Sequence, residues 1–215
     1  MNYYLESAQY ILQGCAVTAK LFFITLLLSL PLGFLGALAK TSRLRPLNVL
    51  MELYTSVVRG TPLLLQIFFV YYGLPILIPG FRLERFSAAA FTFVLNYGAY
   101  FTEIFRGGIQ SIDRGQYEAS RVLGMSYFQT MTRIILPQTV KRVLPPVANE
   151  AITLVKDTAL IVVLGIGDIL RNSKEIVARD FTISPFAIAA VIYLLMNYLV
   201  VIFFRKLEKR YSVYE

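Results

Sequence analysis

Long uninterrupted runs of apolar residues dominate the chain. Four of them contain no charged residue and reach, or nearly reach, the roughly 20 residues that a membrane-spanning helix needs: 21–39, 60–81, 86–102 and 181–204. A fifth run, 143–167, is apolar but contains Glu150, Lys156 and Asp157. The pattern predicts an all-α integral membrane protein with five transmembrane helices, at about 16–39, 52–74, 86–109, 146–166 and 184–204.

The composition supports a membrane protein and argues against a soluble enzyme. Of the 215 residues, 57% are hydrophobic and only 16% are charged, whereas soluble domains have about 25% charged residues. Histidine is absent and Cys15 is the single cysteine, so neither an internal disulfide nor a Cys or His metal centre is expected. The net charge of +8 is attributed to the Lys and Arg residues that membrane proteins concentrate on their cytoplasmic side, and no nucleic-acid partner is expected.

Basic residues indicate which ends face the cytoplasm. Most of the 21 Lys and Arg lie in the loop at 40–45, which includes Arg43, in the segment 106–142, and in the tail after 204. The positive-inside rule then predicts an N-terminus outside and a C-terminus in the cytoplasm. The first residues lack the basic start of a secretory signal, so the first span is expected to be retained. Residues 2–14 are expected to form a short interfacial helix.

The segment 113–137 predicts two helices separated by a sharp break. Asp113 is a candidate N-cap for a helix at about 114–124, and Gly124 supplies the left-handed position that ends it. Ser126, with Gln129 three residues later, is a candidate second N-cap. We expect this second helix to end or kink at Pro137. By itself the pattern also fits an ordinary solvated cytoplasmic hairpin.

The same segment carries a motif that resembles the EAA loop of ABC-importer permeases. Glu118-Ala119-Ser120 is followed at the family's spacing by Gly124, Ile134 and Leu136-Pro137, with Ser120 where the family has Ala. The resemblance implies a coupling helix that sits in a cleft of an ATPase subunit. Glu118, Ala119 and Gly124 would form the docking core, and Glu118 and Arg121 would offer ionic contacts at its rim.

Three further segments resemble the polar amino-acid branch of that family, whose substrates include histidine, glutamate, glutamine and arginine. They are Arg59-Gly60-Thr61-Pro62 with the apolar run after it, the segment 96–108, and Lys156-Asp157-Thr158-Ala159-Leu160. The match covers residues 15–210, so the whole chain is expected to be one permease domain. The resemblance implies two ABC ATPase subunits, a second permease, preferably an identical copy but otherwise a paralogue, an extracytoplasmic amino-acid-binding protein, and the cytoplasmic membrane of a prokaryote.

ATP chemistry is expected in a partner chain. The sequence contains neither a GxxxxGKS nor a GxxxxGKT loop, the element that holds ATP phosphates in such ATPases. This chain is therefore expected to be a translocation subunit rather than an enzyme, with no catalytic residue and no cofactor of its own, while ATP and Mg²⁺ bind the partner ATPase.

Polar side chains inside the predicted spans are candidates for the substrate site. Asn96, Tyr100 and Glu103 share one face of the third span, where the carboxylate suits an ammonium and the amide and phenol suit hydrogen-bond donation. The alternative is structural: Asn96 and Tyr100 bridge helices, and Glu103 pairs with Arg106.

The second and fourth spans add further candidates. Glu150, Thr153 and Asp157 share a face of the fourth span, where Thr153 and Asp157 are candidate substrate contacts. Glu150 and Lys156 are assigned to gating or to an interhelical charge network instead. Gly60 and Pro62 predict a bend in the second span, either a gate or simply the start of the apolar helix, and Arg59 is a candidate contact.

Together these features predict the permease subunit of an importer that moves polar amino acids by alternating access, driven by separate ATPases. Three alternatives remain, of which a non-transporting assembly subunit is disfavoured because it would have no use for polar faces in the third and fourth spans. An importer of the same architecture could carry another small solute, such as a sulfur compound or an opine. A stand-alone channel or ion-coupled carrier is disfavoured because the chain lacks internal repeats.

Overall fold

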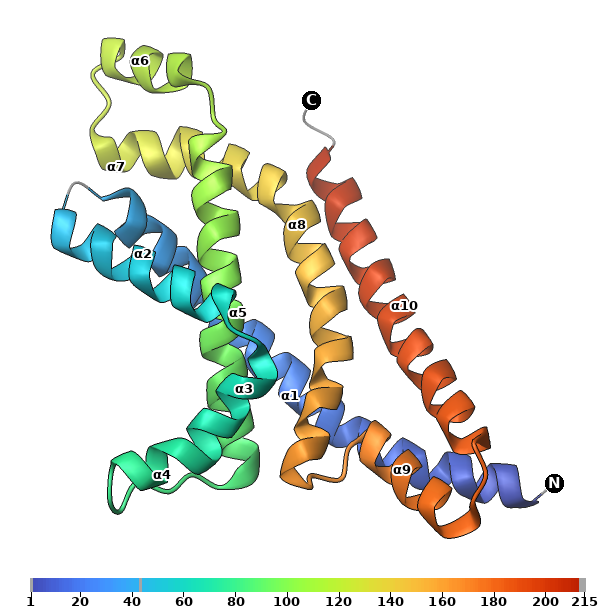
Figure 1. The fold of residues 1–215 in the computed structure, drawn as a ribbon. Coiled ribbons are helices and arrows are strands. Elements are labelled where there is room, and N and C mark those ends of the chain that lie inside the picture. The colour runs from blue at the N-terminus through green and yellow to red at the C-terminus, as the bar shows by residue number, and fades with distance from the viewer. Residues whose placement is uncertain (1, 43, 213–215) are drawn as a thin grey trace.

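The computed structural model describes residues 2–42 and 44–212, and the secondary structure of this part of the chain consists of helices joined by loops, with no strand. The predicted all-α class is confirmed. Arg43, which contributed to the predicted orientation, lies outside the described residues. The four long helices are α1 (Asn2–Thr41), α5 (Arg85–Gln110), α8 (Leu136–Asp157) and α10 (Ser184–Ser212). They cross one another as an open bundle (Figure 1).

Within the described residues, two helices are long and apolar enough to cross a membrane, namely Tyr3–Thr41 of α1 and Ser184–Tyr211 of α10. A third crossing results if α2 (Arg45–Gly60) and the helical run Leu63–Leu77 count as one bent span. Helices α5 and α8 overlap the predicted third and fourth spans, but they carry the polar and charged residues of the site described below. The coarse membrane fold is therefore supported, and the count of five spans stays a prediction.

Helix α1 corrects the expectation of a separate interfacial helix at 2–14, because those residues are its first turns. The helix continues through Pro31 and makes its most extensive contacts with α5. Close approach depends on small residues: a Cβ on Gly33 would overlap Phe101, and one on Gly36 would overlap the Thr102 side chain. Helices α1 and α5 are thus the most extensively packed pair of helices in the described part of the chain.

The second predicted span, 52–74, is broken rather than continuous. Helix α2 ends at Gly60, α3 (Leu63–Phe68) follows at 105°, and the chain continues through a π-helical segment (Phe69–Gly73) into α4 (Leu74–Leu77). Thr61 and Pro62 are extended, with ψ of 143° and 133°. The predicted bend is confirmed, and Pro62 explains it because proline has no N–H to continue the helical ladder.

The segment 113–137 folds as α6 (Arg114–Val122), α7 (Tyr127–Thr130) and a π-helical segment (Met131–Ile135) that runs directly into α8. Of the two outcomes predicted at Pro137, an end or a kink, the end is therefore wrong. A proline inside an α-helix clashes with the carbonyl four residues earlier, here that of Arg133. The π-helical turn that contains Arg133 widens the backbone just before Pro137, so the chain passes through as a helix.

The helix that overlaps the predicted fourth span, 146–166, begins before that span. Helix α8 starts at Leu136 and accommodates Pro145 and Pro146 internally, then tightens into a 3₁₀ helix (Thr158–Leu164) that ends at Gly165, with φ of 69°. Helix α9 (Ile169–Asp180) follows and packs against α1 and α10.

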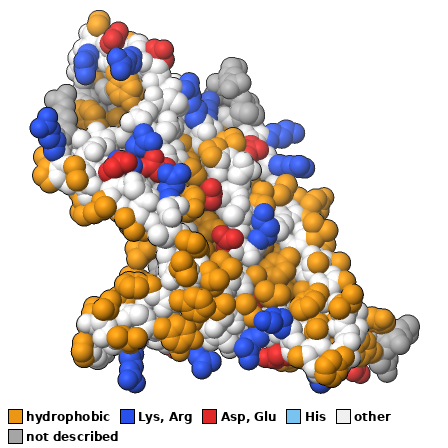
Figure 2. Space-filling view, viewed as in Figure 1, with side chains coloured by type: hydrophobic (Ala, Val, Ile, Leu, Met, Phe, Trp, Pro, Cys, Tyr) orange, Lys and Arg blue, Asp and Glu red, His pale blue; other side chains and the backbone are white. Residues whose placement is uncertain are grey.

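The polar ends of the molecule are well separated. Helix α6 and the C-terminal end of α10 lie at one end in Figure 1, while α4, α9 and the start of α1 lie at the other. In Figure 2, hydrophobic side chains dominate the surface between α3–α4 and the lower part of α10, with Lys and Arg above and below them. The main core cluster joins α1, α5 and α8 through residues such as Leu21, Phe101 and Leu154.

Candidate functional site

A cleft of about 470 Å³ opens where the α2–α3 bend faces α5 and the end of α8. Most of the predicted substrate-binding and gating residues line this cleft. Its lining consists of Arg59, Gly60, Thr61, Pro62, Leu63, Asn96, Tyr97, Tyr100, Glu150, Thr153, Asp157 and Leu160. Three segments that are far apart in the sequence therefore meet at one site.

Helical periodicity explains two walls of this cleft. Asn96 and Tyr100 are one turn apart on α5, and Glu150, Thr153 and Asp157 follow one another along α8 at spacings of three and four residues. Each set therefore presents its polar atoms on one side of its helix. The third wall is different in kind, because the bend exposes backbone and brings Arg59 to the cleft from the last turn of α2.

The charges in the cleft are divided between its walls. The carboxylates of Glu150 and Asp157 lie on α8, and the guanidinium of Arg59 lies on α2. Asp157 accepts a 2.7 Å hydrogen bond from the Tyr97 hydroxyl, while Arg59 lies 5.3 Å from the centre of the Tyr100 ring. An acidic wall opposite a basic one matches the two charges of a zwitterion.

Asn96 is nearly buried, with 4% of its surface exposed. Its Nδ2 donates a 3.0 Å hydrogen bond to Oε1 of Gln66 on α3. The amide thus bridges two helices, as the structural alternative anticipated, and also lines the cleft.

Glu103 lies outside the cleft lining, at the centre of a cluster of positive charges. It contacts the Lys40 ammonium, forms a 2.6 Å ion pair with Arg106 and lies 3.9 Å from Arg59. Lys40 also bonds Thr55 and Glu52, at 2.8 Å and 2.7 Å. The Arg106 pair is the structural alternative considered for Glu103. The cluster joins α1, α2 and α5 and borders the cleft through Arg59.

Two residues of the site are not among those that the sequence pattern singles out. Tyr97 lies about 100° around α5 from Asn96, so periodicity places it on another face, yet both side chains reach the cleft. Gln66 is the lone amide in an otherwise apolar run, which is a usable signal that the motif reasoning missed. Lys156, by contrast, is exposed and does not line the cleft.

Helix α6 has the caps that the sequence predicts. Asp113 accepts a 2.6 Å bond from the Gly115 N–H, and Gly124 adopts a φ of 70°. Ser126 and Gln129 form the predicted reciprocal capping box. These caps fix both ends of a short helix that projects from the bundle (Figure 1).

The predicted coupling residues do not all lie on one surface. Glu118, Ala119, Arg121 and Gly124 are exposed, whereas Ser120 is buried and bonds the Gln116 carbonyl at 2.7 Å. Leu136 is half-buried and Pro137 exposed at the start of α8 rather than on α6.

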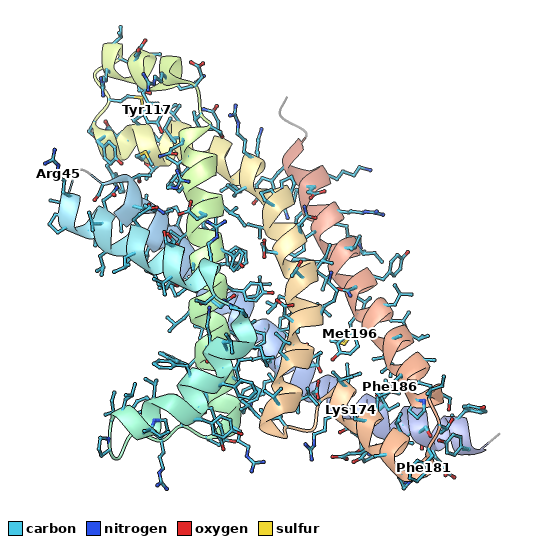
Figure 3. All side chains as sticks on the ribbon, viewed as in Figure 1. Arg45, Tyr117, Lys174, Phe181, Phe186 and Met196 are labelled. Carbon is cyan, nitrogen blue, oxygen red and sulfur yellow. The ribbon has the colours of Figure 1, made fainter. Side chains whose placement is uncertain are left out.

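The exposed apolar residues around Gly124 are a feature that motif reasoning missed. They are strongly solvent-accessible, between 74% and 87% exposed, and comprise Val122, Leu123, Tyr127 and Phe128. On the inner side of α6, Tyr117 points toward α7 (Figure 3) and lines a cavity of about 890 Å³ shared with the end of α1. Val122, Leu123, Tyr127 and Phe128 thus form an exposed apolar patch beside Gly124.

A separate polar cavity of about 400 Å³ lies at the opposite end, between the start of α1 and α9. There the Tyr10 hydroxyl donates a 2.6 Å bond to Glu175, which also pairs with Arg171 at 2.9 Å. Within residues 2–42 and 44–212, no cluster of three or more His, Cys, Asp or Glu side chains could hold a metal ion.

Comparisons with known proteins agree with this arrangement. A family model described as a binding-protein-dependent transport system inner membrane component matches residues 29–213. The arginine transport system permease protein ArtQ of Bacillus subtilis (strain 168) is 39% identical over 202 residues, covering 94% of this chain and 92% of the relative. The glutamine transport system permease protein GlnP of Escherichia coli (strain K12) is 34% identical over 204 residues, covering 94% and 93%.

Solved structures show the same fold. A crystal structure of an amino acid ABC transporter with histidines superposes with a TM-score of 0.89 at 33% identity, covering 97% of each chain. An inward-facing structure of the MetNI methionine ABC transporter superposes with a TM-score of 0.78 at 16% identity, covering 94% of this chain and 96% of the other. At that identity the second match speaks for the fold alone.

Proposed function

The chain belongs to the family of binding-protein-dependent transport system inner membrane components, and from this premise we propose that it forms the membrane pathway for a polar amino acid in an ABC importer. The observation that carries the proposal is the cleft, in which Glu150 and Asp157 face Arg59. An amino acid presents one ammonium and one carboxylate to such a pair of walls. The relatives named for arginine and glutamine transport support this substrate class.

In this proposal Glu150 and Asp157 attract the ammonium, Arg59 attracts the carboxylate, and Tyr100, Thr153 and Asn96 complete the polar lining. The cleft volume of about 470 Å³ lies in the range of small-molecule sites. Glu103 acts from behind the cleft by holding the cluster that includes Arg59. Lys156 has no contact role here.

The proposed assembly contains two copies of this chain, two ABC ATPase subunits and an extracytoplasmic binding protein in a prokaryotic cytoplasmic membrane. The chain crosses the bilayer five times, with the C-terminus and α6 in the cytoplasm. The exposed apolar residues beside Gly124 support ATPase docking at α6, because a largely uncovered apolar patch marks an interaction surface. ATP and Mg²⁺ bind only the partner ATPases.

Transport follows alternating access. ATP-driven closure of the ATPases displaces α6. In the chain, α6 is joined to two of the helices that line the cleft: it follows α5, and it is connected to α8 through α7. Arg142 donates to the Ser111 carbonyl, and Gln138 reaches Gln116 at 3.4 Å, so the two linkers are tied together at their base.

The test is uptake by proteoliposomes that contain the complex of this chain with its native ATPase and binding protein. Labelled L-arginine and L-glutamine are offered with and without internal ATP. We expect ATP-dependent uptake of at least one of them. Asp157→Asn should lower kcat/KM for uptake by about 10–100-fold, the loss expected for one charge-assisted contact. The matched control is Glu175→Gln, which removes one carboxylate at the outer end. Uptake without ATPase, or equal effects of both variants, would refute the proposal.

A further inference from the structure

The break between α2 and α3 leaves helix-end carbonyls without their usual partners. In a continuous helix the N–H of residue 62 would donate to the carbonyl of Val58. Pro62 has no N–H, and the backbone at Thr61 and Pro62 is extended. A buried carbonyl without a donor is costly in a protein placed in a membrane, so another donor is needed at this point.

Gln66 supplies that donor from the next turn of the chain. Its Nε2 donates to the Val58 carbonyl at 2.7 Å and also lies 2.8 Å from Thr61 Oγ1. Thr61 Oγ1 in turn donates to the Val57 carbonyl at 2.9 Å. The side chains of Gln66 and Thr61 therefore replace two hydrogen bonds that the bend removes.

This arrangement fixes which end of each amide faces which neighbour. A backbone carbonyl only accepts, so Gln66 must direct its NH₂ group to Val58 and its Oε1 toward α5. Oε1 also only accepts, so Asn96 must direct its NH₂ group toward Gln66. The Val58 carbonyl, which Pro62 leaves without a backbone donor, thus determines the orientation of both side-chain amides.

We propose that Gln66 is a positioning residue, which orients the Asn96 amide in the cleft and ties it to the bend of the second span. The proposal rests on the proposed function, because it takes the cleft as the ligand site. Gln66 occupies one of the two N–H groups of the Asn96 amide, so Oδ1 and the second N–H remain to meet a ligand. Asn96 can therefore accept a hydrogen bond from a ligand as well as donate one, which extends the expectation that it donates to a substrate.

The acceptor orientation agrees with the charges on the facing wall. Glu150 and Asp157 also present acceptors to the cleft, so Asn96 adds a third acceptor for an ammonium group. A ligand that attracts Asn96 also acts on Gln66, and through it on the hydrogen bonds at Val58 and Thr61. The occupancy of the cleft and the geometry of the bend are therefore linked by one side chain.

The test uses two substitutions of Gln66. Gln66→Met keeps the length and volume of the side chain but removes both polar ends. Gln66→Glu keeps the acceptor for Asn96 and loses the donor for Val58. The control is Thr92→Val. Thr92 lines the same apolar groove as Gln66, but its hydroxyl bonds only the Ala88 carbonyl of its own helix. Uptake of L-arginine and L-glutamine is measured in proteoliposomes of the full complex.

We expect Gln66→Met to raise KM about tenfold with kcat changed less than about twofold, and Thr92→Val to match wild type. In an Asn96→Ala background, Gln66→Met should change KM less than about twofold, because Gln66 acts through Asn96. Equal effects in the two backgrounds, or an unchanged KM in the single variant, would overturn the proposal. If the Gln66→Met variant does not assemble, the same comparison with Gln66→Leu, which also lacks both polar ends, decides.

Hydrogen–deuterium exchange of the complex provides a readout that is independent of transport. We expect exchange in the segment 57–66 to accelerate at least about fivefold in Gln66→Met and Gln66→Glu, and to be unchanged in Thr92→Val. If wild type transports neither amino acid, the proposed function fails while accelerated exchange still supports the link between Gln66 and the bend. Unchanged exchange in both Gln66 variants overturns the inference whatever the transport result.

Discussion

Glu103 and Glu52 form a matched pair of carboxylates on one cation, and neutralising each in turn tests how the charge cluster stabilises the fold. Both contact the Lys40 ammonium, but the Glu103 side chain is 14% exposed and that of Glu52 is 60% exposed, while Lys40 itself is 7% exposed. Glu103→Gln also removes the charge that faces Arg106 and Arg59. Losing one partner of a buried ion pair costs about 3–5 kcal/mol, whereas an exposed pair contributes about 0–1 kcal/mol.

Because Glu52 stays on Lys40, we expect Glu103→Gln to cost about 2–3 kcal/mol rather than the full buried-pair value. At about 2–4 °C per kcal/mol for a chain of this size, the unfolding midpoint in detergent should fall by about 4–12 °C. Glu52→Gln should lower it by less than about 3 °C. The double variant Lys40→Met with Glu103→Leu should recover part of the loss, since a buried pair can be replaced by apolar packing. Equal shifts for the two glutamine variants would refute the assignment of the cluster to the interior.

Two further variants test the coupling helix and the cleft. Gly124→Trp should leave the chain in the membrane but abolish co-purification of the ATPase. The φ of 70° is strained for any residue with a Cβ, and the indole would cover the exposed apolar patch beside Gly124. Normal co-purification would exclude this docking site. Asn96→Ala should raise KM for uptake about tenfold with the complex intact, and unchanged uptake kinetics would remove Asn96 from the ligand site.

Much of the fold was predictable because apolar run length and capping residues act locally. The predicted third span, 86–109, agrees closely with α5, and the caps at Asp113, Gly124 and Ser126 are as expected. The errors arose where local rules conflict. Pro137 was expected to end or kink a helix. The helix does not end there, because a π-helical turn precedes the proline, and the sequence pattern contains no signal for such a turn.

Helical periodicity predicted which side of each helix carries the candidate site residues, but not which of these residues line the cleft. Asn96, Tyr100 and Glu103 share one face of α5 by periodicity, yet only the first two line the cleft. The third residue lies one turn further along, where Lys40 and Arg106 reach it from either side. Periodicity along one helix cannot reveal Lys40, which comes from α1, 63 residues away in the chain, so the ion cluster required the tertiary structure.

The order of elements connects the surface helix α6 to the cleft. Helix α6 is joined to α5, which carries Asn96 and Tyr100, and through α7 to α8, which carries Glu150 and Asp157. The base of α6 is held by a separate apolar cluster that includes Ile109, Ile112, Met131 and Ile135. Helix α6 is therefore continuous with two walls of the cleft, while the third wall, at the α2–α3 bend, is joined to α5 by the hydrogen bond between Gln66 and Asn96 and by the bond from the Tyr54 hydroxyl to the Leu95 carbonyl. In the proposed alternating-access cycle, motion of α5 against the bend would stretch the bond between Gln66 and Asn96, so this contact is the point at which movement of α6 would act on a ligand.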